Sequence, residues 1–140
     1  MTDGPIIVID DDRDDQEILQ DAFRELGILN KLVFFENTNE AFQYLLTTKD
    51  KPLIIISDIN IPGKGGLKLK KEIDSDPYLR QKSIPFIYLT TFVDPRAVDI
   101  AYKELNIQGF FKKSESYEEL KKELSLIVDY WKCCYHPNTN

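Results

Sequence analysis

The chain has few of the residues that most often form cross-links, metal sites or nucleophiles. Its 140 residues include one histidine, His136, and two cysteines, which are adjacent at Cys133 and Cys134. Neighbouring cysteines close a disulfide only through a strained ring, and two thiols with one histidine are too few for a structural zinc site. We expect no disulfide framework, no histidine phosphodonor and no His-based catalytic triad. We interpret this segment as an inert tail, with a redox or metal role as the alternative.

An excess of positive charge and long apolar runs are absent as well. The sequence has 18 basic and 24 acidic residues, a formal net charge of −6. A chain with this net negative charge has no excess of basic residues with which to bind nucleic acid or an anionic membrane. No apolar run approaches the roughly 20 residues of a membrane-spanning helix. The segment Met1–Pro5 has no basic residue, unlike the start of a signal peptide. We therefore expect a cytoplasmic protein that binds neither nucleic acid nor membrane.

What the sequence does contain is four short apolar runs that each lead into a chemically functional residue. The four pairs are Ile6–Ile9 before Asp10, Leu53–Ser57 before Asp58, Phe86–Leu89 before Thr90, and Gly109–Lys112 before Lys113. Such β-branched and aromatic runs are typical of strands buried on both faces of a parallel sheet. Ligands of open α/β sheets bind beyond the carboxyl ends of the strands. The sequence thus predicts acid, hydroxyl and ammonium groups at one edge of a sheet.

Amphipathic segments with helix start signals separate these runs. We predict helices that begin at the capping residues Asp14, Asn37, Asp94 and Ser116, a further helix over about 67–74 that ends at Asp76-Pro77, and another strand over 31–35. The strict alternation of five strands with five helices predicts one doubly wound α/β domain. We place the domain at residues 1–131 and a short, loose tail at 132–140.

The acidic residues at the strand ends suggest a metal-assisted reaction. Carboxylates of Asp10, Asp11 and Asp58 on neighbouring strands repel one another unless a cation lies among them, and oxygen ligands around an open site suit Mg²⁺. An aspartate can also act as a nucleophile toward phosphorus and form an aspartyl phosphate. Lys113 and Thr90 could then neutralise and hydrogen-bond the phosphoryl oxygens. The alternative is that the acidic run from Asp10 only caps the first helix.

The ordered set of motifs resembles the receiver domain of two-component response regulators, in its stand-alone form, over about residues 5–131. The motifs are Asp10-Asp11, Asp58 followed by Pro62 and Gly66, Leu89-Thr90-Thr91, and Gly109–Lys113. The resemblance implies a flavodoxin-like (βα)5 fold with a five-stranded parallel sheet in the order 2-1-3-4-5.

The resemblance also implies a role for each acidic residue. Asp58 would accept the phosphoryl group from the phosphohistidine of a sensor histidine kinase or of a histidine phosphotransfer protein. Asp11 would bind the cation directly, with Mg²⁺ as the expected ion and Mn²⁺ as the alternative, and Asp10 would bind it mainly through water. Asp58 and the backbone carbonyl of Asn60 would be further ligands.

The resemblance also implies roles for three further residues. Thr90 and Lys113 would hold the phosphoryl oxygens, and Thr90 and Phe110 would form the conformational switch.

The sequence departs from the family pattern at Ser114, where a proline, often after a cis bond, usually follows the lysine. Because a cis bond before a residue other than proline costs about 2.5–4 kcal/mol, we expect a trans or strained bond between Lys113 and Ser114. Lys112 could compete with Lys113, although strand alternation should turn it to the other face.

The resemblance implies a single-domain regulator that is not a turnover enzyme. It would signal by contact with an unknown downstream protein, as a monomer or weak dimer. One alternative is a pseudo-receiver, an interaction module without the chemistry. Another is a phosphatase like the haloacid dehalogenases that uses Asp10 and Asp12, although Asp14 stands where that family expects Thr or Val.

Overall fold

The computed structural model describes residues 3–135. His136 and the end of the chain lie outside the described residues, so the expectation of a loose tail stays a prediction. Cys133 and Cys134 are inside them, and neither forms a disulfide.

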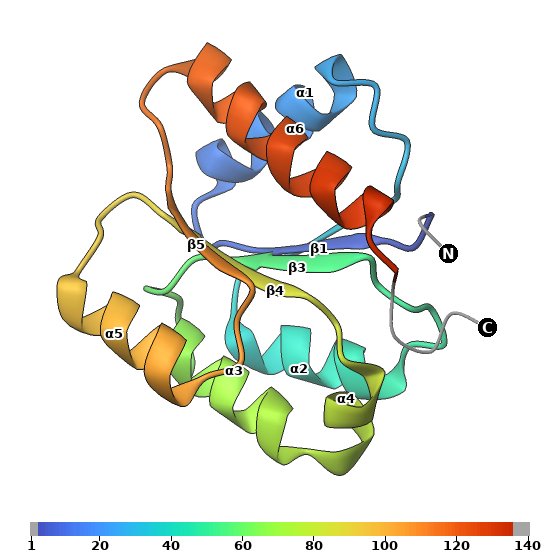
Figure 1. The fold of residues 1–140 in the computed structure, drawn as a ribbon, viewed down its shortest axis with the longest axis vertical. Coiled ribbons are helices and arrows are strands. Elements are labelled where there is room, and N and C mark those ends of the chain that lie inside the picture. Colours follow the sequence, from blue (N-terminus) through green and yellow to red (C-terminus); the bar gives the residue numbers. More distant parts are fainter. Residues whose placement is uncertain (1–2, 136–140) are drawn as a thin grey trace.

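Five strands form one parallel sheet with the order β2-β1-β3-β4-β5 (Figure 1). The strands are β1 (Ile6–Ile9), β2 (Leu32–Phe35), β3 (Ile54–Ser57), β4 (Phe86–Thr90) and β5 (Gly109–Lys112). This order confirms the fold expected from the resemblance. The register pairs Ile9 with Ser57 and Thr90 with Lys112. The residues that follow these positions therefore lie at one common edge of the sheet.

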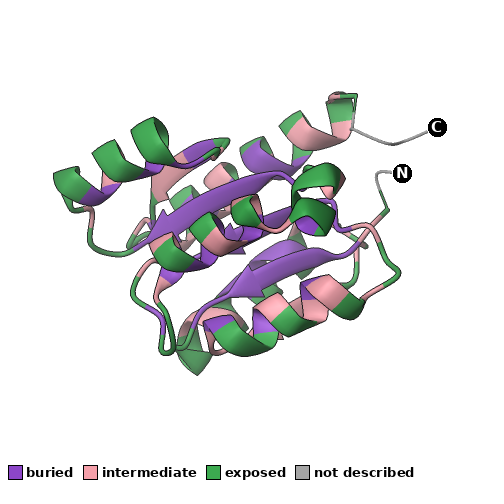
Figure 2. Cartoon of the chain, turned by 90° about the horizontal axis from the view of Figure 1, so that it is seen from below, coloured by how far each residue is buried: buried purple, intermediate pink, exposed green. Residues whose placement is uncertain are grey.

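Helices cover both faces of the sheet. Helices α1 (Arg13–Glu25) and α6 (Tyr117–Cys133) pack on one face, and the other face carries α2 (Thr38–Thr47), α3 (Gly66–Ser75), α4 (Pro77–Lys82) and α5 (Pro95–Glu104) (Figure 1). Figure 2 shows the buried sheet between helices whose outer faces are exposed. Within residues 3–135 no helix has the length and apolar character needed to cross a membrane.

The start of α1 differs from the prediction. Asp12, and not Asp14, is the N-cap: its carboxylate accepts hydrogen bonds from the backbone N–H groups of Asp14, at 2.9 Å, and Asp15, at 3.3 Å. Asp12 has extended backbone angles, whereas Asp14 already lies within the helix. The chain thus turns into the helix two residues earlier than expected. As a result, Asp15 lies in the first turn, close to the edge of the sheet.

Helix α4 was not predicted. Asp76-Pro77 ends α3 as expected, but it also begins another helix, because the Asp76 carboxylate accepts from Leu79 N at 3.0 Å and Pro77 occupies the first helical position. The described chain therefore has six helices and not five. The other predicted caps are confirmed at Asn37, Asp94 and Ser116.

The cap of α1 can be tested by a pair of substitutions. Asp12→Ala should lower the free energy of unfolding by about 1 kcal/mol, because two N–H groups lose their acceptor. Asp14→Ala removes the same charge from the same turn but no cap, so it should cost only a few tenths of a kcal/mol, the lower range of a charge near a helix N-terminus. Urea denaturation of both variants gives the comparison. Equal losses would contradict the assignment of Asp12.

Candidate functional site

Two carboxylates lie side by side at the carboxyl edge of the sheet. Asp10 N donates to Phe35 O at 2.9 Å, and Asp58 N donates to Ile9 O, also at 2.9 Å. Both bonds continue the strand pairing by one residue, so the backbone fixes these two positions. The Asp10 residue is only 2% exposed, while the Asp58 side chain is 13% exposed. Asp58 is therefore the more accessible of the two carboxylates to an incoming reactant.

The ammonium of Lys113 lies among three carboxylates. It donates to Asp10 Oδ2, to Asp15 Oδ2 at 3.0 Å and to Asp58 Oδ2 at 3.4 Å. Lys113 N also donates to Thr90 O at 2.7 Å, which fixes the backbone of the lysine to the end of β4. The structure thus brings Asp10, Asp58 and Lys113 together, as the sequence predicts.

Asp15 is a residue of this site that the sequence analysis missed. It was counted there only as part of an acidic run that caps the helix. If Asp12 had been predicted as the N-cap, Asp15 would have been recognised as the third residue of the helix. In a capping box, the side chain at that position turns back toward the chain entering the helix.

Burial and charge act in opposite directions on the ionisable groups of the site. Burial raises the pKa of Asp10, while hydrogen bonds from Lys113 and from Asp12 N oppose this change. Burial alone would lower the pKa of Lys113, but the hydrogen bonds and charges of the surrounding carboxylates outweigh it and raise that pKa above its ordinary value. Lys113 is therefore a permanently charged cation at neutral pH.

The loop after Asp58 is held in place by contacts along its length. Asp58 Oδ1 accepts from Ile59 N at 2.7 Å, and Gly66 N donates to Ile59 O at 2.7 Å. At residue 66 a side chain is excluded, since a Cβ would lie 2.4 Å from Asp58 O. Lys64 N donates to Thr38 Oγ1 at 2.9 Å and ties the loop to α2. The glycine eight residues after Asp58 thus lets α3 begin directly against the backbone of the acidic residue.

Thr90 and Phe110 lie near this site on adjacent strands. Thr90 is buried, and its hydroxyl donates to Phe92 O at 3.5 Å. The half-buried ring of Phe110 packs on Tyr88, with 5.6 Å between the ring centroids. Tyr88 is fully buried, its hydroxyl donates to Gly66 O at 2.7 Å, and burial raises its pKa far above the usual value. Tyr88, which the sequence analysis did not single out, therefore connects Phe110 to the start of α3.

The residues present fit a small divalent cation. Across residues 3–135 no three acidic, cysteine or histidine side chains form a ready-made metal site. Asp10 and Asp58 do converge on one cationic nitrogen, and Asp11 and Asn60 lie exposed beside them in the chain. Carboxylate and carbonyl oxygens are the donors that Mg²⁺ and Mn²⁺ prefer.

The peptide bond after Lys113 is trans, as is every other peptide bond of the described chain. This agrees with the expectation for a lysine that is followed by serine.

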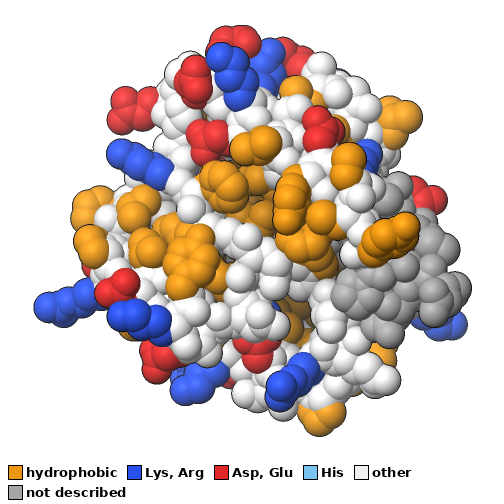
Figure 3. Space-filling view, viewed as in Figure 1, with side chains coloured by type: hydrophobic (Ala, Val, Ile, Leu, Met, Phe, Trp, Pro, Cys, Tyr) orange, Lys and Arg blue, Asp and Glu red, His pale blue; other side chains and the backbone are white. Residues whose placement is uncertain are grey.

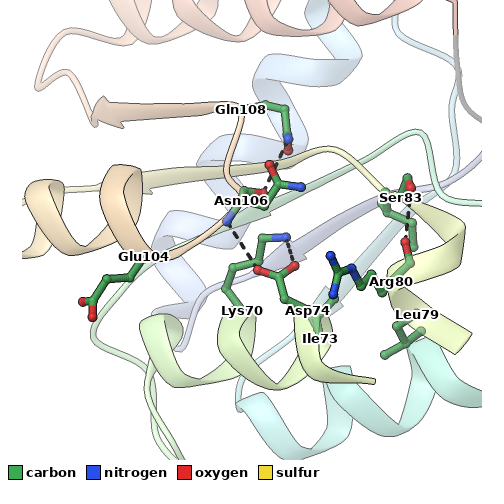
Figure 4. Close-up of a pocket in the computed structure, with 10 residues that line it drawn as sticks. Lys70, Ile73, Asp74, Leu79, Arg80, Ser83, Glu104, Asn106 and Gln108 are labelled. Atoms are coloured by element: carbon green, nitrogen blue, oxygen red, sulfur yellow. Dashed lines mark hydrogen bonds and ion pairs between the residues drawn. The ribbon is translucent and has the colours of Figure 1, made fainter. Parts of the chain in front are cut away.

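A separate cavity of about 290 Å³ lies at the opposite edge of the sheet, next to the residues that precede β4 and β5 (Figure 4). Two of its charged groups, Lys70 and Asp74, are paired with each other within its wall. Lys70 is buried and its ammonium lies 2.5 Å from Asp74 Oδ1, while Asp74 Oδ2 accepts from Asn106 N at 3.3 Å. We interpret this network as a structural contact that holds α3 against the segment before β5.

Removal of the Lys113 cation should destabilise the protein. Lys113→Met leaves buried Asp10 without its ion-pair partner, and we expect the free energy of unfolding in the presence of EDTA to fall by about 3 kcal/mol. Lys112→Met is the matched control, because Lys112 is exposed and should change stability by less than about 0.5 kcal/mol. If both variants lost the same amount in urea denaturation, the central role of Lys113 would be wrong.

Comparison with known proteins gives consistent matches. The sequence model of the response regulator receiver domain family matches residues 6–125. The response regulator Rcp1 of Synechocystis sp. is 27% identical over 131 residues, which cover 90% of this chain and 87% of Rcp1. The solved structure of the phosphorylated cyanobacterial phytochrome response regulator RcpA has a TM-score of 0.85 and 25% identity, and the match covers 96% of this chain and 99% of that one. The Mn²⁺-bound form of Rcp1 gives a TM-score of 0.82 with the same identity and coverage.

Proposed function

Because this chain belongs to the response regulator receiver domain family, we propose that it accepts a phosphoryl group on Asp58 and signals this state through protein contacts. The observation that carries the proposal is the position of Asp58: a partly exposed carboxylate beside a buried cation, at the carboxyl edge of a parallel sheet. Receiver domains are signalling modules and not turnover enzymes. We place this one in the cytoplasm, with a histidine kinase or a histidine phosphotransfer protein as the donor.

The hydrogen bonds of Asp58 favour one of its two oxygens as the proposed nucleophile. Oδ1 accepts from Ile59 N at 2.7 Å, whereas Oδ2 has, among residues 3–135, only the longer contact of 3.4 Å to Lys113. Oδ2 would attack the phosphorus and form the new O–P bond, as the P–N bond to the donor histidine breaks and the electron pair returns to the imidazole. Lys113 would neutralise charge on the phosphoryl oxygens, and the hydroxyl of Thr90 would donate to one of them.

A divalent cation fits the same edge. Asp10, Asp11, Asp58 and the backbone carbonyl of Asn60 would hold Mg²⁺ or Mn²⁺, and the Mn²⁺-bound structure of the similar Rcp1 supports the binding of a divalent cation. When bound, such an ion neutralises the charge that spreads over the phosphoryl oxygens during transfer.

The two alternative functions are not favoured. A phosphatase that used Asp10 as its nucleophile would need a free carboxylate, but Asp10 is buried and accepts hydrogen bonds from Asp12 N and Lys113. Its partner acid, Asp12, is engaged as the cap of α1. A pseudo-receiver would have no need for Asp10, Asp58 and Lys113 to converge.

The signal would leave through the face formed by α5, β5 and α6. Phosphorylation adds about −1.5 to −2 charges, which would draw Thr90 toward the phosphoryl group and allow Phe110 to reorient against Tyr88. Hydrophobic side chains gather over α5 and α6 on the side where β5 forms the edge of the sheet (Figure 3). Among the exposed large hydrophobic residues of α5 and α6 are Ile100, Tyr102, Leu126 and Tyr130. We propose this face as the contact surface for a downstream protein.

The phosphorylation site is tested by intact-mass measurement after incubation with acetyl phosphate and Mg²⁺. The parent chain should gain a single phosphoryl group, whereas Asp58→Asn, or the parent in EDTA, should gain none. Asp14→Asn removes a nearby exposed charge and should still be labelled. Labelling of Asp58→Asn would move the nucleophile to Asp10 or Asp12 and revive the phosphatase alternative.

The lifetime of the phosphoryl group should depend on Phe92. The carbonyl of this residue accepts from Thr90 Oγ1, so its backbone lies beside the proposed phosphoryl site. The apolar side chain cannot orient water for hydrolysis, whereas a carboxylate can. We expect Phe92→Glu to shorten the lifetime several-fold and the control Phe92→Leu to leave it near the parent value. A lifetime unchanged by Phe92→Glu would show that the side chain is turned away from the phosphorus.

A further inference from the structure

The three carboxylates around Lys113 differ in what the proposed reaction requires of them. Each proton of the ammonium has one carboxylate oxygen to accept it, from Asp10, Asp15 or Asp58. In the proposed function Asp58 becomes an acyl phosphate, and Asp10 is shared with a divalent cation. Asp15 is the one of the three that neither reacts nor serves as a proposed ligand of the cation.

The location of Asp15 suits it for a constant contact with Lys113. It lies in the first turn of α1, and its backbone N–H donates to the Asp12 cap at 3.3 Å. This bond fixes Asp15 to a rigid element and not to the loop that carries Asp58. The contact from Asp15 Oδ2 to Lys113 Nζ is 3.0 Å, shorter than the 3.4 Å contact from Asp58.

Besides Asp10, which the proposed function shares with a cation, Asp15 is the described side chain that would still hold the Lys113 ammonium after the reaction. Its backbone is fixed by the bond from Lys113 N to Thr90 O. Ser114 follows it, and serine does not restrict the backbone as a proline ring would. The direction of the ammonium therefore depends on the side chains that surround it.

From these contacts we infer that Asp15 is a positioning residue, which keeps the ammonium of Lys113 at the reaction site while Asp58 is phosphorylated. The inference rests on the proposed function, since Lys113 can assist transfer only if Asp58 is the acceptor. Asp15 itself touches neither the phosphorus nor the oxygen that attacks it. Its effect should be transmitted entirely through Lys113.

The test measures the rate of phosphorylation by intact mass at a series of acetyl phosphate concentrations with Mg²⁺ present. Asp15→Asn should lower the saturating rate roughly five- to tenfold, because the asparagine oxygen can still accept from Lys113 but carries no charge. The donor concentration that gives half of this rate should change little, because Asp15 does not contact the donor. Asp15→Glu, which restores the carboxylate, should recover part of the rate. Asp14→Asn, which removes one charge from the same helical turn, should match the parent.

A double-mutant cycle with Lys113→Met isolates the route of the effect. If Asp15 acts through Lys113, adding Asp15→Asn to the Lys113→Met variant should change the rate no further. Circular dichroism verifies that each variant is folded, and the comparison of Asp15→Asn with Asp15→Glu does not depend on the Lys113 variant. A rate for Asp15→Asn equal to or above that of the parent overturns the inference, as does an equal slowing by Asp14→Asn. Labelling of Asp58→Asn, by contrast, would overturn the proposed function itself.

Discussion

The arrangement of this site depends on the attraction between one buried cation and three carboxylates. Asp10, Asp15 and Asp58 come from the end of β1, the start of α1 and the end of β3, and alone they would repel one another. Lys113, at the end of β5, supplies the positive charge that allows them to lie together. The parallel sheet makes this possible, because it brings strand ends that are far apart in sequence to one edge.

The sheet and most of the site could be predicted because both depend on local patterns. A strand buried on both faces requires a continuous apolar run, and the residue after such a run must lie at the sheet edge. This reasoning found Asp10, Asp58, Thr90 and Lys113 without knowledge of their contacts. The strand order came from the family resemblance, since apolar runs alone do not show which strands are neighbours.

The parts that were missed depend on competition between equivalent local signals. Several aspartates follow β1, and each of them could cap a helix; only the path of the backbone selects Asp12. The error at this cap also concealed Asp15. Asp76-Pro77 is both a stop signal and a start signal, so the sequence could not show that α4 follows α3 at once. Tyr88 resembles any aromatic residue of a buried strand until its hydroxyl is seen to bond Gly66 O.

Tyr88 connects the loop after Asp58 with the ring of Phe110 through its packing and its hydrogen bond. Its hydroxyl is buried and must keep an acceptor, since an unpaired buried hydroxyl would be costly. The acceptor, Gly66 O, belongs to the residue that packs against the backbone of Asp58. The same ring lies between Phe86, at 5.1 Å, and Phe110, at 5.6 Å. A displacement at the start of α3 would therefore shift the packed aromatic rings of β4 and β5.

The place of Lys113 in the chain also has a consequence for biosynthesis. The acidic residues at positions 10, 15 and 58 leave the ribosome well before the lysine that neutralises them. A nascent chain that ends before β5 carries the repulsion among these carboxylates without the compensating ammonium, and it lacks one edge strand of the sheet. Translation of residues 109–113 supplies both at once. The acidic edge of the sheet can therefore close only late in synthesis, when nearly the whole domain has been made.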